Sequence, residues 1–221
     1  MEKKLIVIEG ACDGIGKTTQ FQLLKNRLQE EDIPVVSHHF PSYGTYQGEA
    51  VSRYLKGELG SIKELSAYFI NSLYAMDRAI TWHTKLKSEY EDGKLILLDR
   101  YTTSSLIYQS ASFENINDIK DFVNYVLDYE YEKLDIQKPD LVLFLCAPFD
   151  LVTEMRNKRK TNEGIINDIH ESDLEYMRRV YDVGMFLADY LNWDKVFCEE
   201  NNSLRSISDI HNDIHRLVLK K

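Results

Sequence analysis

Short, continuous apolar runs recur along the chain, separated by longer segments with helical periodicity. The runs cover residues 5–8, 35–36, 95–98, 141–145 and 196–197. None of them alternates apolar with polar positions, and continuous apolar strands are typical of a parallel sheet covered by helices on both faces. The pattern therefore predicts a parallel sheet of roughly five strands.

The segments between these runs predict helices over residues 18–30, 62–90, 118–134, 150–160, 172–191 and 206–219. In the first of them, Phe21, Leu24 and Leu28 recur at spacings of three and four, which places them on one helical face. Strands that alternate with helices indicate a parallel, doubly wound α/β fold. Ligands of such folds bind at the carboxyl ends of the strands, so we expect the site in the loops after residues 8, 39, 98 and 145.

Length and composition narrow the class of protein. The chain has 221 residues, of which 43% are hydrophobic and 29% charged, so we expect a single domain over residues 1–221. Acidic residues outnumber basic ones, 36 to 27, which argues against a partner that is nucleic acid. No apolar run could span a membrane, no secretory signal is visible, and the three cysteines lack metal-ligand spacing. These features predict a soluble cytoplasmic protein that binds no membrane, and we expect structural or surface roles for its histidines.

A candidate phosphate-binding loop follows the first predicted strand. Residues 9–20 read Glu-Gly-Ala-Cys-Asp-Gly-Ile-Gly-Lys-Thr-Thr-Gln. Glycines allow the backbone to turn closely around phosphates, and the N-terminus of the next helix attracts anions. We expect ATP to contact Ala11, Cys12, Asp13, Gly14, Ile15, Gly16, Lys17, Thr18 and Thr19. Lys17 would reach the β- and γ-phosphates, and the Thr18 hydroxyl would ligate Mg²⁺.

The loop departs from the usual spacing of glycine, four residues and then Gly-Lys-Ser/Thr. Counting back from Gly16, the first glycine position falls on Ala11, and Gly10 stands one residue too early. Either Ala11 fills that position or one extra residue bulges from the loop.

A second candidate element is the acid at the end of the strand over residues 95–98. Asp99 follows this strand, where phosphate-loop enzymes place a carboxylate beside Mg²⁺. Arg100 comes next and could clamp a phosphate with its planar guanidinium group.

Several motifs together resemble the thymidylate kinase family. They are Asp13-Gly14 with Gly16–Gln20, Phe40-Pro41, Tyr74–Arg78, Asp99-Arg100-Tyr101 with residues 102–109, and the strand with its lead-in over 139–145. They occur in family order across nearly the whole chain. The resemblance implies a three-layer, P-loop nucleoside monophosphate kinase-like fold that transfers the γ-phosphoryl group of ATP to dTMP. It also implies a homodimer packed through helices, with the helix over residues 62–90 as a candidate surface.

The resemblance also assigns the residues that bind dTMP. They are Asp13, Phe40, Pro41, Tyr74, Arg78, Arg100, Ser105 and Gln109. Asp13 would accept from the sugar 3′-hydroxyl, Tyr74 would stack on the base, Gln109 would read the thymine edge and Arg100 would grip the phosphate. Each assignment has a structural alternative: Tyr74 could belong to the core, and Arg78 could pair with a surface acid such as Asp77. Ser105 and Gln109 could be ordinary helix residues, and Phe40-Pro41 an ordinary strand exit.

Two positions depart from the family pattern in ways that concern charge. Many members carry an arginine directly after Phe-Pro, where this chain has Ser42 and no arginine before Arg53. Some carry an arginine in the phosphate loop, where this chain has Gly14. We expect catalytic charge to come from Arg156 and Arg159 in a polar lid over residues 154–170, although this basic cluster could also be a solvated helix end.

Two other functions remain open at this point. A deoxynucleoside kinase also has a phosphate loop and an Asp-Arg pair, but its early base lies in a Glu-x-x-Arg-like segment. Glu49 and Arg53 have the wrong spacing for that segment. The irregular loop would also suit a nucleotide-binding protein that has lost catalysis.

Overall fold

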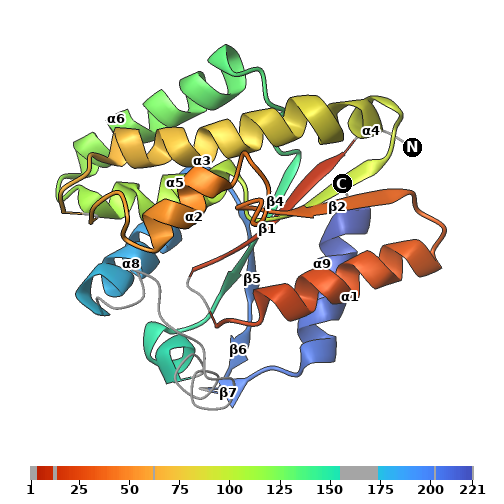
Figure 1. Cartoon of the computed structure of the whole chain (residues 1–221). Coiled ribbons are helices and arrows are strands. Elements are labelled where there is room, and N and C mark those ends of the chain that lie inside the picture. Colours follow the sequence, from red (N-terminus) through yellow and green to blue (C-terminus); the bar gives the residue numbers. More distant parts are fainter. Residues whose placement is uncertain (1–3, 12–13, 62, 155–173, 202, 221) are drawn as a thin grey trace.

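A five-stranded parallel sheet forms the centre of the molecule (Figure 1). The computed structural model describes residues 4–11, 14–61, 63–154, 174–201 and 203–220. The strand order is β2-β3-β1-β4-β5. The strands are β1 (Leu5–Gly10), β2 (Val35–His39), β3 (Leu95–Asp99), β4 (Leu141–Cys146) and β5 (Asp194–Phe197). All five predicted strands are therefore present, and the parallel α/β fold is confirmed.

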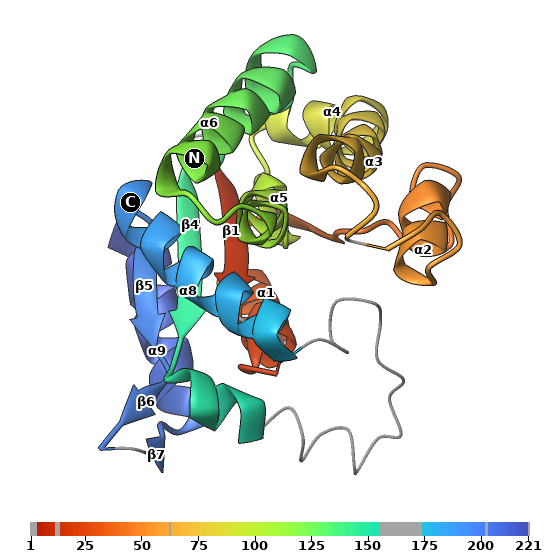
Figure 2. The same cartoon turned by 90° about the vertical axis from the view of Figure 1, so that its left-hand side faces the viewer.

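Helices cover both faces of this sheet and complete three layers (Figure 2). One face carries α1 (Lys17–Glu30) and α9 (Ile207–Lys220). The other face carries α3 (Ala67–Thr81), α5 (Thr102–Tyr108), α6 (Ile116–Leu127) and α8 (Leu174–Tyr190). The short helix α2 (Glu49–Leu55) lies beyond α3 at the rim, and a small hairpin of β6 (Glu199–Glu200) and β7 (Ser203–Leu204) follows β5.

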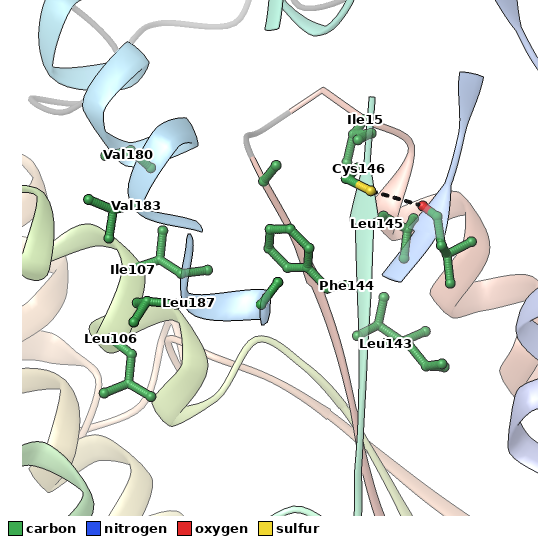
Figure 3. Close-up of a cluster of buried hydrophobic side chains, with 14 of the residues drawn as sticks. Ile15, Leu106, Ile107, Leu143, Phe144, Leu145, Cys146, Val180, Val183 and Leu187 are labelled. Atoms are coloured by element: carbon green, nitrogen blue, oxygen red, sulfur yellow. Dashed lines mark hydrogen bonds between the residues drawn. The ribbon is translucent and has the colours of Figure 1, made fainter. Parts of the chain in front are cut away.

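The alternation of side chains along the strands explains why both faces are apolar. Leu5 and Val7 of β1 pack with Trp82 on the α3 side, whereas Ile6 and Ile8 pack with Leu24 of α1. Figure 3 shows the same division in β4, where Phe144 faces α5 and α8. Strands covered in this way need apolar residues on both sides, which is the pattern in the continuous apolar runs of β1, β3 and β4.

The predicted long helix over residues 62–90 is three consecutive elements in the structure. Ser66 caps α3, its hydroxyl accepting from the backbone N–H of Phe69 at 3.1 Å, so the helix starts later than predicted. The π-helical turn η1 (Trp82–Leu86) then joins α3 to α4 (Lys87–Glu91). A second π-helical segment, η3 (Asp128–Lys133), extends α6, and the 3₁₀ turn η2 (Ser110–Ser112) follows α5. No helix in the described ranges is long and apolar enough to cross a membrane.

Candidate active site

The carboxyl ends of β1, β2 and β3, which are neighbours in the sheet, bring the predicted phosphate loop beside the predicted metal-binding acid. In the strand register, Ile8 of β1 and His39 of β2 both stand opposite Asp99 of β3. The residues that follow these positions therefore gather at one edge of the sheet. This is the edge where ligands bind in open α/β folds.

The predicted phosphate loop follows directly after β1. Gly10 is the last residue of β1, and the Ala11 backbone N–H still donates to the Leu145 carbonyl of β4 at 3.0 Å. Gly14 and Gly16 adopt φ values of +98° and +85°, in the left-handed region that favours glycine. Cys12 and Asp13 lie outside the described residues.

The helix that follows the loop is open to an anion at its N-terminus. Gly16 caps α1 without a side-chain hydrogen bond, and the first turn contains no acidic residue. Ile15 is buried in the core, whereas Thr18 and Thr19 are exposed at the start of the helix. The first-turn N–H groups and the helix dipole are therefore available for phosphate.

Asp99 connects two side chains that could contact substrates. Its Oδ1 accepts from the Lys17 ammonium, and its Oδ2 lies 3.1 Å from His39 Nδ1. Burial favours the neutral form of Asp99, but the His39 hydrogen bond and the Lys17 ammonium outweigh it, so the pKa of Asp99 lies well below its usual range. Asp99 is therefore a carboxylate at neutral pH.

The donor set at this point suits Mg²⁺. The Asp99 carboxylate and the exposed Thr18 hydroxyl are hard oxygen donors, and Mg²⁺ in kinases typically uses one or two protein oxygens together with phosphate and water. In the ranges that the structure describes, no group of three or more His, Cys, Asp or Glu residues could hold a metal ion by itself.

Arg100 is held in a left-handed backbone conformation with φ +66°. Its guanidinium Nη1 lies 3.6 Å from Glu9 Oε1 and 3.3 Å from the Ser104 hydroxyl. Glu9 is fully buried and also accepts from the Thr103 hydroxyl at 2.9 Å. Uncommon backbone conformations of this kind cluster at functional sites, and here the conformation places a cation next to the phosphate loop.

A pocket opens beside Arg100 and contains every predicted dTMP-binding residue that the structure describes. These residues are Phe40, Pro41, Tyr74, Arg78, Arg100, Ser105 and Gln109. They come from the end of β2, from α3 and from the segment that follows β3. Other lining residues are His39, Tyr43, Leu55, Tyr101, Ser104 and Tyr108. An aromatic wall with a few polar groups is typical of a small-molecule site.

Arg78 is fully buried at the base of this pocket and is matched by an acid that the sequence did not suggest. Its Nε and Nη2 each lie 2.6 Å from a carboxylate oxygen of Glu130, and Nη2 also donates to the Ser105 hydroxyl at 2.8 Å. The alternative of a surface pair with Asp77 is wrong, because Asp77 is itself buried and accepts from the Ser42 backbone N–H at 2.7 Å.

Gln109 has an unused hydrogen-bonding atom at the pocket. The residue is 3% exposed, and its Oε1 has no hydrogen-bond partner among the described residues. A buried amide oxygen without a partner is costly, and a ligand that donates an N–H group would satisfy it.

Sequence reasoning missed Glu9, His39 and Glu130. Glu9 and His39 directly follow or end predicted strands, so their positions at the carboxyl edge of the sheet could have indicated a role. Glu130 gave no such signal, because it lies in a π-helical turn between two tyrosines. Arg156 and Arg159 of the predicted lid lie outside the described residues.

Comparisons with known proteins agree on one family. The thymidylate kinase family profile matches residues 8–214. The chain is 31% identical to the thymidylate kinase of Nostoc punctiforme, covering 100% of this chain and 99% of the relative. It is 31% identical to a probable thymidylate kinase of Thermococcus onnurineus, covering 96% of each. The solved thymidylate kinase of Candida albicans has the same fold, with a TM-score of 0.74 at 21% identity over 99% of this chain and 92% of that one.

Proposed function

The chain belongs to the thymidylate kinase family, and from that premise we propose that it transfers the γ-phosphoryl group of ATP to dTMP, giving dTDP and ADP. The observation that carries the proposal is the junction of two sites at Asp99. This carboxylate contacts Lys17 of the predicted phosphate loop and His39, which lines the aromatic pocket together with Arg100. Such a junction suits in-line transfer between two nucleotides.

On the donor side, the phosphate loop holds ATP. Lys17 and the backbone N–H groups of Ala11–Thr19 bind the phosphates, with the helix N-terminus favouring negative charge. Thr18 and Asp99 would hold Mg²⁺ directly or through water, and the ion would supply positive charge next to the phosphates of ATP. When ATP binds, the Lys17 ammonium leaves Asp99 and donates to the phosphates instead.

On the acceptor side, the pocket holds dTMP. Tyr74 stacks on the base, and the partnerless Gln109 Oε1 accepts from the N–H group at the thymine edge. Ser105 and Arg78 line the base end, Arg100 grips the phosphate, and Asp13 accepts from the 3′-hydroxyl. Phe40 and Pro41 form the wall.

Positioning and charge supply most of the catalysis. The acceptor oxygen already belongs to a phosphate, so no strong general base is needed. Arg156 and Arg159 of the lid stabilise the migrating phosphoryl group and exclude water. The enzyme acts in the cytoplasm as a homodimer packed through α3 and its neighbours.

An ADP-release assay with Mg·ATP tests the reaction, with dTMP, dUMP, thymidine and dAMP offered separately as acceptors. We expect turnover with dTMP and little with thymidine. Turnover with thymidine would move the protein to the deoxynucleoside kinases, which the family match does not favour. ATP binding without turnover of any acceptor would mean that the irregular loop has abolished catalysis.

A further inference from the structure

The acceptor pocket holds fewer available cations than its motifs suggest. In the described part of the chain, the lining residues that can carry positive charge are His39, Arg78 and Arg100. Arg78 is fully buried and matched by both carboxylate oxygens of Glu130. Arg100 shares its charge with Glu9, 3.6 Å away. A doubly charged phosphate could therefore accept a further charge-assisted hydrogen bond in this pocket.

The segment after Phe40-Pro41 does not provide a further cation. Ser42 is turned away from the pocket, with its N–H donating to Asp77 and its hydroxyl 2.9 Å from His38 Nε2. Arg53, the next arginine in the sequence, pairs with Glu49 at 2.9 Å on the exposed side of α2. The position that an arginine would occupy therefore lacks a cation.

His39 stands directly before Phe40 and lines the same pocket. Its Nδ1 lies 3.1 Å from Asp99 Oδ2, and its side chain is 46% exposed, so the rest of the ring is accessible from the pocket. Tyr43, another lining residue, stacks against this ring with centroids 6.1 Å apart and planes inclined by 28°. The ring is thus held on one side by a carboxylate and on one face by an aromatic neighbour.

We propose that His39 binds the 5′-phosphate of dTMP, in place of the missing arginine after Phe-Pro, and links that phosphate to Asp99. The proposal rests on the proposed function, because it concerns the same acceptor. Nδ1–H donates to Asp99 Oδ2, and Nε2–H donates to a phosphate oxygen. The ring can make both contacts at once, because its two nitrogens lie on different edges and one of them already faces Asp99.

This arrangement would connect the donor and acceptor sites through one carboxylate. Asp99 Oδ1 contacts Lys17 of the phosphate loop, and Asp99 Oδ2 contacts His39 of the acceptor pocket. His39 is therefore close to both the phosphate that attacks and the group that holds ATP. A charge-assisted hydrogen bond at this point would favour the bound position of dTMP over that of uncharged thymidine.

Titration calorimetry without ATP tests the proposal, with dTMP and thymidine as paired ligands. The variants are His39→Ala, His39→Asn, which keeps a donor near Nδ1, and His39→Gln, which keeps one near Nε2. We expect His39→Ala to weaken dTMP binding by about 10-fold or more, with thymidine and Mg·ATP binding within about twofold of wild type. His39→Gln should restore part of the dTMP affinity, and His39→Asn should not. His83→Ala, which changes a histidine outside the pocket on η1, is the matched control.

The pattern of losses separates the possible roles of His39. An equal loss for thymidine and dTMP would mean that the ring only packs against the nucleoside, and it would overturn the proposal. A loss confined to Mg·ATP, or rescue by His39→Asn alone, would mean that His39 only positions Asp99, which also overturns it. Melting temperatures of all variants identify any that fail to fold. A wild-type protein that neither binds nor phosphorylates dTMP would refute the proposed function itself.

Discussion

At the scale of single residues, Lys17 and Arg100 are two cations that the fold holds at the carboxyl edge of the sheet. Lys17 is 7% exposed and held by Asp99, and Arg100 is fixed by its left-handed backbone and by Glu9. We predict that Lys17→Ala and Arg100→Ala each lower kcat/KM for dTMP phosphorylation by at least about 100-fold, the scale of a lost transition-state contact. Lys25→Ala, on the same helix as Lys17, should leave the rate unchanged. Near-wild-type turnover of either site variant would contradict its assignment.

His38, next to His39, has a different and structural role. Burial disfavours its charged form, and although Asp77 opposes this, the pKa of His38 falls from 6.5 to about 4. Below pH 6.5 the unfolded chain takes up a proton at this position, whereas the folded chain does so only near pH 4. The stability that neutral His38 contributes is therefore complete above pH 6.5 and is lost as the pH falls toward 4.

Urea unfolding at pH 7 and pH 5 checks this prediction. The free energy of unfolding should fall more between these two values in wild type than in His38→Gln, which keeps a polar group near Ser42 but cannot titrate. Equal falls in the two proteins would show that His38 is not responsible.

At the scale of elements, the π-helical segment η3 provides the acid that allows Arg78 to be buried. Glu130 is fully buried, and the Thr102 hydroxyl donates to it at 2.9 Å, so this carboxylate joins η3, α3 and α5 behind the pocket. Removing one partner of a buried ion pair leaves an uncompensated charge. We predict that Glu130→Ala lowers the free energy of unfolding by about 3–5 kcal/mol in urea titrations.

Two further variants sharpen this test. Glu132→Ala changes an exposed acid of the same segment and should lower the free energy of unfolding only slightly. The double variant Arg78→Met/Glu130→Leu replaces the pair by apolar groups and should recover much of the lost stability. If Glu130→Ala lowers the free energy of unfolding no more than Glu132→Ala does, the stabilising role of the Arg78–Glu130 pair is contradicted.

The elements also show what could be predicted from the sequence. The strands and most of the helices could be predicted. Strands buried on both faces leave continuous apolar runs in the sequence, whereas helices buried on one side leave apolar residues three and four positions apart. The π-helical turns could not, since their residues Trp82–Leu86 continue the apolar pattern of an ordinary helix. The family motifs predicted which residues meet in the pocket. They could not predict the Arg78–Glu130 pair, because its two residues are 52 positions apart and no pattern around either of them indicates the other.

At the scale of the whole molecule, the carboxyl edge of the sheet and the outer side of α3 are two surfaces of different character. The carboxyl edge holds the charged groups of the site, whereas the outer side of α3 leaves apolar side chains exposed. Phe69 and Met76 are seven positions apart on one face of α3 and are 44% and 45% exposed. Tyr125 of α6, 37% exposed, lies 4.8 Å from the Tyr68 ring at the start of α3, so the apolar surface extends across both helices.

This surface supports the proposed homodimer, because a second copy could bury it through the same residues. We predict that wild type elutes as a dimer in size-exclusion chromatography with light scattering. Phe69→Glu and Met76→Glu should shift it toward a monomer, since each places a charge in the centre of an apolar interface. Leu219→Glu is the matched control, because Leu219 is 58% exposed on α9, which covers the opposite face of the sheet. A monomeric wild-type protein at micromolar concentration would refute the dimer, and equal dissociation by Leu219→Glu would place its interface elsewhere.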